Sequence, residues 1–168
     1  MSSGLNYTPP ITQILSWFKY VCVNDTVIAD WCMERFGKAP SFFAGVDAQN
    51  PPGEANAPLI TCEWDIHKGG SKMPYEIYRI IVSCGLFNPE IIVDGNSAEV
   101  VGNTQIAEML YLVRDRIDAA LPNQIQVAEC EIVNTNGYFL PMFFGQLEFF
   151  VHVPRCIGGS VTFPQPPA

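Results

Sequence analysis

The sequence contains few basic residues. Of its 168 residues, nine are Lys or Arg and 17 are Asp or Glu, which gives a formal net charge of −8. Proteins that bind nucleic acid need clustered Lys and Arg. The nine basic residues of this chain are scattered, so its composition argues against a nucleic-acid-binding protein. An acidic balance favours solubility, and it also fits a protein past which DNA slides without binding.

The sequence also lacks the motifs that mark most reaction centres. It has no G-x-S-x-G elbow, no P-loop and no dinucleotide fingerprint. One of its two histidines, His67, stands two residues after Asp65, but this spacing is common by chance and is more typical of a solvent-facing strand end than of a metal site. Glu129 and Glu131 share one face of a predicted strand, about 6–7 Å apart, which fits paired hydrolytic carboxylates but is more typical of a solvated surface. We therefore predict no catalytic residue, no metal ligand and no cofactor.

Zinc-binding cysteine pairs and long hydrophobic runs are missing as well. None of the six cysteines forms a C-x-x-C pair, and several stand in apolar contexts, such as Val-Cys-Val at Cys22, so we predict buried, reduced thiols. No apolar run approaches the about 18 residues of a membrane-spanning helix. The N-terminal MSSGLNYTPP lacks the basic and apolar regions of a signal peptide. These features predict an intracellular protein.

A helical pattern is present near the N-terminus. Apolar residues recur at helical spacing over Thr12–Phe36, which predicts one interrupted helix or two short ones. Asn24 or Asp25 can cap the second part, and Gly37 ends it.

Alternating patterns of apolar residues predict strands in the rest of the chain. After a short candidate at Ser41–Val46, the predicted strands are Leu59–Ile66, Tyr75–Leu86, Ile91–Val93, Glu99–Val101, Ile125–Val133 and Leu147–Val153. The pairs Gly69-Gly70 and Gly95-Asn96 mark turns between neighbouring strands.

Thr104–Leu121 is the clearest helix, with Asn103 or Thr104 as its cap and Pro122 as its stop. Strand runs joined by turns predict an α+β fold in which an antiparallel or mixed sheet carries a long helix, at about 104–121, on one face. An N-terminal helical segment completes a single domain over residues 11–154. Residues 1–10 and 155–168 are predicted to be arms, the second extended because it is rich in Gly and Pro.

The stretch Gly137–Pro154 holds five of the eleven phenylalanines. Its second half alternates as an ordinary core strand, but its first half crowds around Pro141 without alternation. An apolar bend that cannot point wholly inward often covers another subunit. We therefore predict a partner interface formed by Tyr138, Phe139, Leu140, Met142, Phe143 and Phe144. If it faces a partner, the double substitution Phe143→Asp, Phe144→Asp leaves a folded monomer that cannot assemble.

The order of elements resembles that of the tail terminator, or tail-completion, proteins of long-tailed bacteriophages. An N-terminal helix and a Pro-rich loop lead into strands that include PYEIYRIIVSCGLF, and the helix NTQIAEMLYLVRDRIDAAL precedes a final strand pair. The resemblance covers about Ile11–Pro154 and lies in the architecture, since the family has only weak sequence motifs. The C-terminal arm and the extra aromatic residues have no counterpart in it.

The resemblance implies a non-enzymatic virion protein that is assembled in the host cytoplasm. Such a protein forms a ring, a homohexamer in the family, on the last layer of tail-tube protein, ends tube growth and meets the head–tail connector, while DNA passes through its lumen without specific binding. It also implies that loops at Asp47–Pro58 and His67–Met73 dock onto partners, through Asn50, Glu54, His67, Lys68 and Lys72. Two alternatives remain open: another head–tail connector, neck or tube component, or a small-molecule binding module or enzyme with an aromatic pocket.

Overall fold

The computed structural model describes residues 10–46, 49–70, 72–134, 140–154 and 164–167. Three α-helices, α1 (Pro10–Asn24), α2 (Thr26–Phe36) and α3 (Val101–Ala120), accompany a short 3-10 turn, η1 (Glu54–Asn56). The strands are β1 (Ser41–Ala44), β2 (Leu59–Lys68), β3 (Tyr75–Phe87), β4 (Ile91–Asp94), β5 (Ser97–Val100), β6 (Gln126–Asn134) and β7 (Met142–Pro154). The arm at residues 1–10, except Pro10, and most of the C-terminal arm lie outside the described residues.

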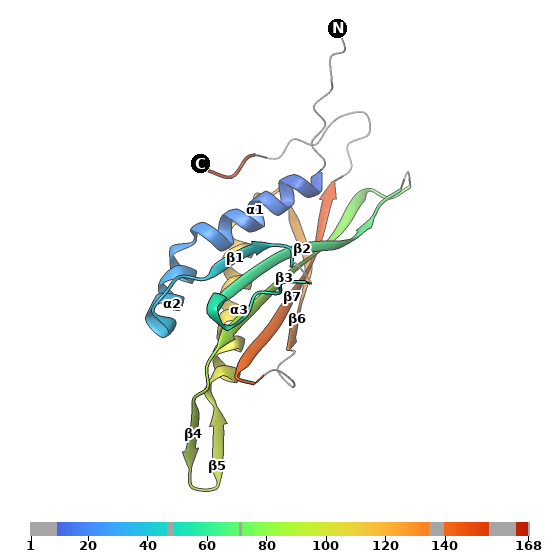
Figure 1. The fold of residues 1–168 in the computed structure, drawn as a ribbon. Coiled ribbons are helices and arrows are strands. Elements are labelled where there is room, and N and C mark those ends of the chain that lie inside the picture. The colour runs from blue at the N-terminus through green and yellow to red at the C-terminus, as the bar shows by residue number, and fades with distance from the viewer. Residues whose placement is uncertain (1–9, 47–48, 71, 135–139, 155–163, 168) are drawn as a thin grey trace.

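Five strands form one sheet in the order β1-β2-β3-β7-β6, and β4 and β5 form a separate hairpin. The sheet is mixed, because β1 runs parallel to β2 while the remaining neighbours are antiparallel. Helix α3 packs on β3, β6 and β7, and α1 packs on β1, β2 and α3, on the same face of the sheet (Figure 1). The predicted α+β fold with a helix on one sheet face is confirmed.

The N-terminal helical pattern is two helices joined at Asp25. The Asp25 carboxylate accepts hydrogen bonds from the backbone N–H groups of Val27, at 3.0 Å, and Ile28, at 3.1 Å, so it caps α2 as predicted. Its other oxygen accepts a hydrogen bond from Nε of Arg116 in α3 at 2.7 Å. Gly37 ends α2 with φ of 72°, a left-handed conformation that glycine adopts without steric cost.

Helix α3 begins at Val101, earlier than predicted, and the predicted cap is wrong. Its N-cap is Val100, which supplies no side-chain hydrogen bond. The backbone N–H of Val101 donates to the carbonyl of Glu90 at 3.2 Å, and the Thr104 hydroxyl donates to the Glu99 carboxylate at 3.0 Å. Contacts with the preceding hairpin therefore stabilise the first turn of α3, and the residues next to the helix start do not reveal such contacts.

Strand alternation places one set of side chains between the sheet and the helices. The odd residues of β7 from Phe143 to Val153 are buried, and so are the even residues of β3 from Tyr78 to Leu86. They pack against Ile14 and Phe18 of α1 and against the apolar stripe of α3. The core consists of Ile14, Phe18, Ile60, Ile80, Val82, Leu86, Ile106, Met109, Leu110, Val113, Phe143, Leu147 and Phe149, among others.

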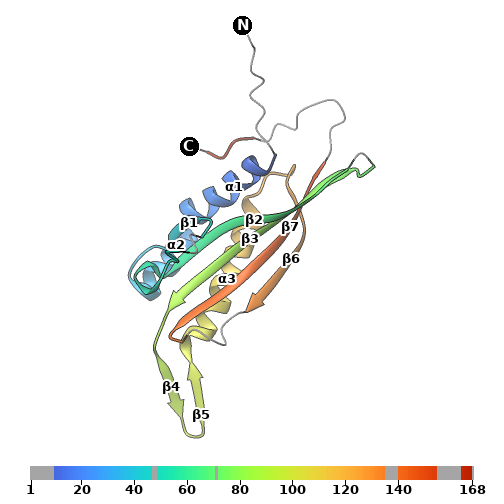
Figure 2. The same cartoon turned by 45° about the vertical axis from the view of Figure 1, so that its right-hand side comes forward.

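The other side of the sheet, called here the open face, carries no helix within the described part of the chain, as Figure 2 shows. Its side chains alternate with those of the core, so it presents Ile81 and Arg79 of β3 beside Glu148 and Phe150 of β7. These residues are half-buried. At one end the segment after β1 covers this face, and there Thr61 is 3% exposed.

Candidate interaction surface

The hairpin β4–β5, called here the hairpin arm (Ile91–Val100), projects from the body between β3 and α3 (Figure 1). Asp94 and Ser97 close it around a two-residue turn, in which Gly95 has φ of 57°. In a type II′ turn only the first central residue needs such a left-handed conformation, so Gly95-Asn96 suits the turn that the sequence predicted. The arm contains four paired residues on each strand, and it is therefore about 14 Å long.

The hairpin arm is amphipathic. Residues that pair across an antiparallel hairpin share a face. Ile91 pairs with Val100 and Val93 with Ala98, which gives one wholly apolar face, called here the apolar face of the arm. The opposite face carries Ile92, Asp94, Ser97 and Glu99.

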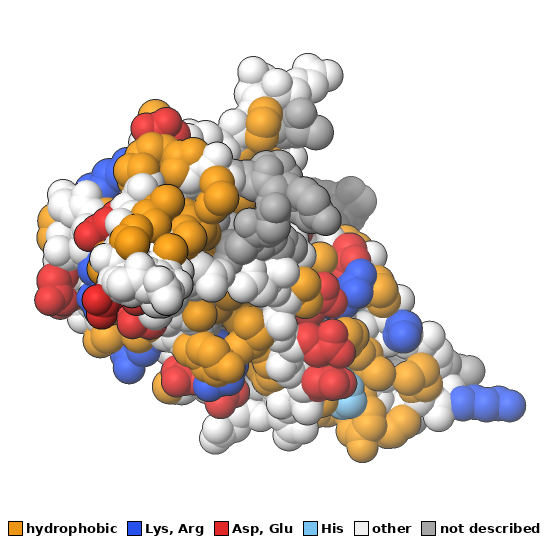
Figure 3. Space-filling model, turned by 90° about the horizontal axis from the view of Figure 1, so that it is seen from below, with side chains coloured by type: hydrophobic (Ala, Val, Ile, Leu, Met, Phe, Trp, Pro, Cys, Tyr) orange, Lys and Arg blue, Asp and Glu red, His pale blue; other side chains and the backbone are white. Residues whose placement is uncertain are grey.

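The apolar face of the arm is exposed in the isolated chain. Ile91 is 59% exposed and Val93 is 71% exposed. Figure 3 looks onto the end of the molecule where the arm projects, and hydrophobic side chains gather there in patches among acidic ones. A two-stranded hairpin is at best marginally stable in water unless another surface packs on it. The arm therefore has the features of an element that a partner covers.

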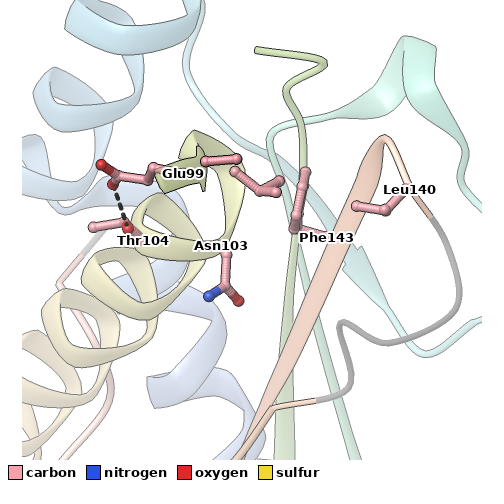
Figure 4. Close-up of a pocket in the computed structure, with 7 residues that line it drawn as sticks. Glu99, Asn103, Thr104, Leu140 and Phe143 are labelled. Atoms are coloured by element: carbon pink, nitrogen blue, oxygen red, sulfur yellow. Dashed lines mark hydrogen bonds between the residues drawn. The ribbon is translucent and has the colours of Figure 1, made fainter. Parts of the chain in front are cut away.

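A cavity of about 420 Å³ lies at the root of the hairpin arm (Figure 4). Leu140 and Phe143 form one wall, and Asn103 and Thr104 from the first turn of α3 form another. The arm contributes Ala98, Glu99 and Val100. Leu140 is 65% exposed at the rim, so it extends the apolar surface of the arm toward the body.

The six residues of the predicted aromatic interface do not share one environment. Phe143 is 1% exposed and lies in the chain's own core against α3, so its prediction as a partner contact is wrong. The physical reason is that β7 already begins at Met142, and strand alternation turns Phe143 inward and its neighbours Met142 and Phe144 onto the open face. Leu140 is exposed as predicted, and Tyr138 and Phe139 lie outside the described residues.

Phe144 lines a groove of about 440 Å³ on the open face. Val46, Pro51 and Pro52 of the segment after β1 form its other wall, with Leu59 at its floor. The groove is mainly apolar, with Glu63 and Gln146 at its polar side.

Farther along the open face, Arg79 forms an ion pair with Asp65 and another with Glu148, the latter at 3.1 Å. Hydrogen bonds from Arg79 lower the pKa of Asp65, and the two carboxylates raise the pKa of Arg79. Glu148 is paired across the sheet with Glu131, so the arginine offsets the negative charge of neighbouring strands.

A register shift in β2 between Trp64 and Ile66 separates the Asp65–His67 pair. Asp65 contacts Arg79 on the open face, while the His67 ring stacks on Tyr78, with 4.5 Å between ring centroids, on the helix face. Asp65 and His67 therefore lie on opposite faces of the sheet, because a β-bulge reverses the side-chain alternation between them. Among the described residues no group of three or more His, Cys, Asp or Glu side chains has the geometry to hold a metal ion.

The predicted docking loops are only partly loops. His67 and Lys68 belong to β2, because this strand continues two residues beyond its predicted end. Nε2 of His67 lies 3.4 Å from Oε2 of Glu76, so its side chain is engaged within the hairpin β2–β3. Lys72 is exposed in the turn that follows. Asn50 and Glu54 are exposed in the segment between β1 and β2, where Glu54 opens η1.

The cysteines for which a structure is described are all free thiols. Cys22, Cys32, Cys62 and Cys84 are buried, and Cys130 is half-buried. Burial raises the pKa of Cys32 and Cys62 to about 12 each. The prediction of buried, reduced thiols is confirmed for the four buried cysteines but not for Cys130.

Sequence reasoning missed the hairpin arm as a surface, although it located the turn. The sequence does contain a pattern that indicates an apolar face on this hairpin, because apolar residues stand at matching positions on either side of Gly95-Asn96. The prediction located both strands and the turn but gave them no separate place in the fold.

No known protein family matches the sequence, and a search of curated proteins finds no relative. Within the described residues, no helix combines the length and apolar composition that crossing a membrane requires.

Proposed function

We propose that this chain is a structural subunit that assembles with copies of itself through the hairpin arm. The observation that carries this proposal is the exposed apolar face of the arm, with Val93 at 71% exposure on an element that cannot bury it against its own body. Such a face is costly in a monomer and useful in an interface. The arm lies at one end of the molecule, so a contact with a different surface of the next copy is head-to-tail, and head-to-tail contacts close into rings when the rotation allows.

The specific assembly we propose is the ring that caps the tail tube of a long-tailed bacteriophage and joins it to the head connector. The α+β body with its order of helix, strands, helix and strand pair supports this proposal by its resemblance to tail terminator proteins. The net charge of −8 also supports it, since an acidic lumen lets DNA pass by repulsion. The ring subunit is not an enzyme, and its partners are its own copies, tube protein and connector protein.

A pair of matched variants tests the role of the arm. Val93→Asp places a charge on the apolar face, whereas Ile92→Asp places the same charge on the opposite face of the same strand. Burying a Val side chain contributes about 1.5–3 kcal/mol, and burying an unpaired carboxylate costs still more, so Val93→Asp should weaken assembly at least ~10²-fold. Ile92→Asp should leave assembly close to that of the unchanged chain.

Native mass spectrometry and negative-stain microscopy give the readout, with and without phage tail-tube subunits. We expect a ring, closed or on tube ends, for the unchanged chain and for Ile92→Asp, and monomers for Val93→Asp. Equal assembly of both variants would exclude the arm as the interface. A chain that stays monomeric at every concentration and never adds to tube ends would exclude the ring itself and favour a pocket at the arm root as the functional site.

A further inference from the structure

The C-terminal segment Pro164–Pro167 contacts helix α1 through a tryptophan. The indole Nε1–H of Trp17 donates a hydrogen bond to the backbone carbonyl of Pro164 at 2.8 Å, across 147 residues of sequence. In Figures 1 and 2 the segment lies beside α1, at the end of the molecule opposite the hairpin arm. Pro166 is half-buried, while Pro164, Gln165 and Pro167 are exposed.

The segment has the sequence of a polyproline II ligand. Pro164-Gln165-Pro166-Pro167 is a P-x-x-P motif, and proline restricts φ to the value that the polyproline II helix requires. This helix has no internal hydrogen bonds, so its carbonyl groups remain available as acceptors. It is also largely formed before binding, which reduces the entropy that docking costs.

Helix α1 supplies the chemistry that recognises such a ligand. Trp17 and Tyr20 stand three residues apart on one side of the helix, and their rings meet edge-on with 5.9 Å between centroids. Both rings are half-buried and pack partly on the core, which holds them in place. An aromatic surface with an indole N–H directed at a proline carbonyl is the combination by which proline-rich peptides are bound in grooves lined with aromatic residues.

We propose that Trp17 and Tyr20 form a binding site for proline-rich peptides in the polyproline II conformation, and that the chain's own segment Pro164–Pro167 is its ligand. Covalent attachment raises the effective concentration of the segment to the millimolar range, so a weak intrinsic affinity is sufficient for occupancy. This site is independent of the ring proposal, because it involves neither the hairpin arm nor the open face.

The three tryptophan indoles, Trp17, Trp31 and Trp64, provide an internal comparison in ¹H–¹⁵N NMR spectra of the full-length chain. Replacing Pro164, Pro166 and Pro167 together with alanine leaves α1 unchanged. We expect the indole N–H signal of Trp17 to shift upfield as it loses its hydrogen bond, while the signals of Trp31 and Trp64 stay in place. An unchanged Trp17 signal would overturn the proposal.

Adding the peptide TFPQPPA to this triple-alanine chain should move the Trp17 signal back toward its original position. The matched peptide TFAQAAA should have no effect. Trp17→Phe in the same background keeps an aromatic ring but removes the donor, and it should weaken binding of TFPQPPA about 2- to 10-fold, measured by the signals of the surrounding backbone amides. Equal binding of both peptides, or full binding to Trp17→Phe, would refute a site built on proline and the indole donor. None of these readouts depends on assembly, so they can fail or succeed apart from the ring.

Discussion

Replacing Gly102 with alanine tests whether Phe143 belongs to the chain's own core. In most helices this substitution stabilises, because alanine is favoured over glycine by up to ~1 kcal/mol. Gly102 is the second residue of α3, directly under the Phe143 ring. A Cβ atom at this position would meet three ring carbons of Phe143, of which even the farthest, Cζ, lies only 2.8 Å away. Ordinary van der Waals contact between carbon atoms needs about 3.5–4.0 Å.

The clash should outweigh the helix gain. Phe143 is 1% exposed, and only the side of its ring that borders the cavity at the root of the hairpin arm leaves space into which it can shift. Overpacking of a dense core costs about 1–3 kcal/mol, and a contact this short belongs to the upper part of that range. Subtracting the gain of up to ~1 kcal/mol leaves a net loss of about 1–2 kcal/mol in the free energy of unfolding. For a chain of this size that lowers the melting temperature by about 2–8 °C.

Urea denaturation and thermal melting of the purified variants give the measurement. Gly53→Ala is the matched control, since nothing lies within 4 Å of its added Cβ and its φ of −117° suits alanine. It should be neutral, or more stable by up to about 1 kcal/mol. Combining Gly102→Ala with Phe143→Leu should recover part of the loss, with a favourable coupling of about 0.5–3 kcal/mol. A Gly102→Ala chain as stable as the unchanged one would refute the burial of Phe143 and restore it as a candidate partner contact.

Three further changes probe the rest of the fold. Asp25→Ala removes the α2 cap and should cost about 0.5–2 kcal/mol in urea denaturation, whereas Asp25→Asn, which keeps an acceptor, should cost less. Arg79 lowers the pKa of Asp65, so the ion pair stabilises the fold fully when the pH is above the ordinary carboxyl pKa of 3.8, and this stabilisation is lost as the pH falls below it. Asp65→Asn should therefore lower the melting temperature at pH 7, and the difference from the unchanged chain should shrink below pH 3.8. Burial raises the pKa of Cys130 to about 11, so this thiol should react only slowly with Ellman's reagent. In a Cys156→Ser background, at most this one thiol should react before the chain unfolds. Rapid reaction of two or more thiols in the folded chain would contradict the burial of the others.

Local features of the fold could be predicted from the sequence. Asp25 and Gly37 act on backbone groups within a few residues, so their roles as cap and stop depend on little else. The alternation of β3 and the turn at Gly95-Asn96 are local in the same sense. The α+β class follows from the order of such elements.

The features that matter most for the candidate surface depend on contacts between distant segments. Phe143 is a core residue only because α3 offers Gly102 as space beneath its ring. Asp65 and His67 lie on opposite faces of the sheet because β2 pairs with β3 across a bulge. Neither arrangement can be predicted from a sequence pattern that spans ten residues or fewer.

The sequence by itself determined the helices, the strands and the hairpin turn, apart from the first turn of α3, because propensities, alternation and most caps act over a few residues. Only the tertiary structure decided which apolar side chains remain uncovered, since that depends on which strand packs under which helix. It moved the candidate interface from the phenylalanines of β7 to Ile91 and Val93 of the hairpin arm. It also placed the C-terminal prolines beside Trp17, a contact between the two ends of the chain that no local pattern encodes.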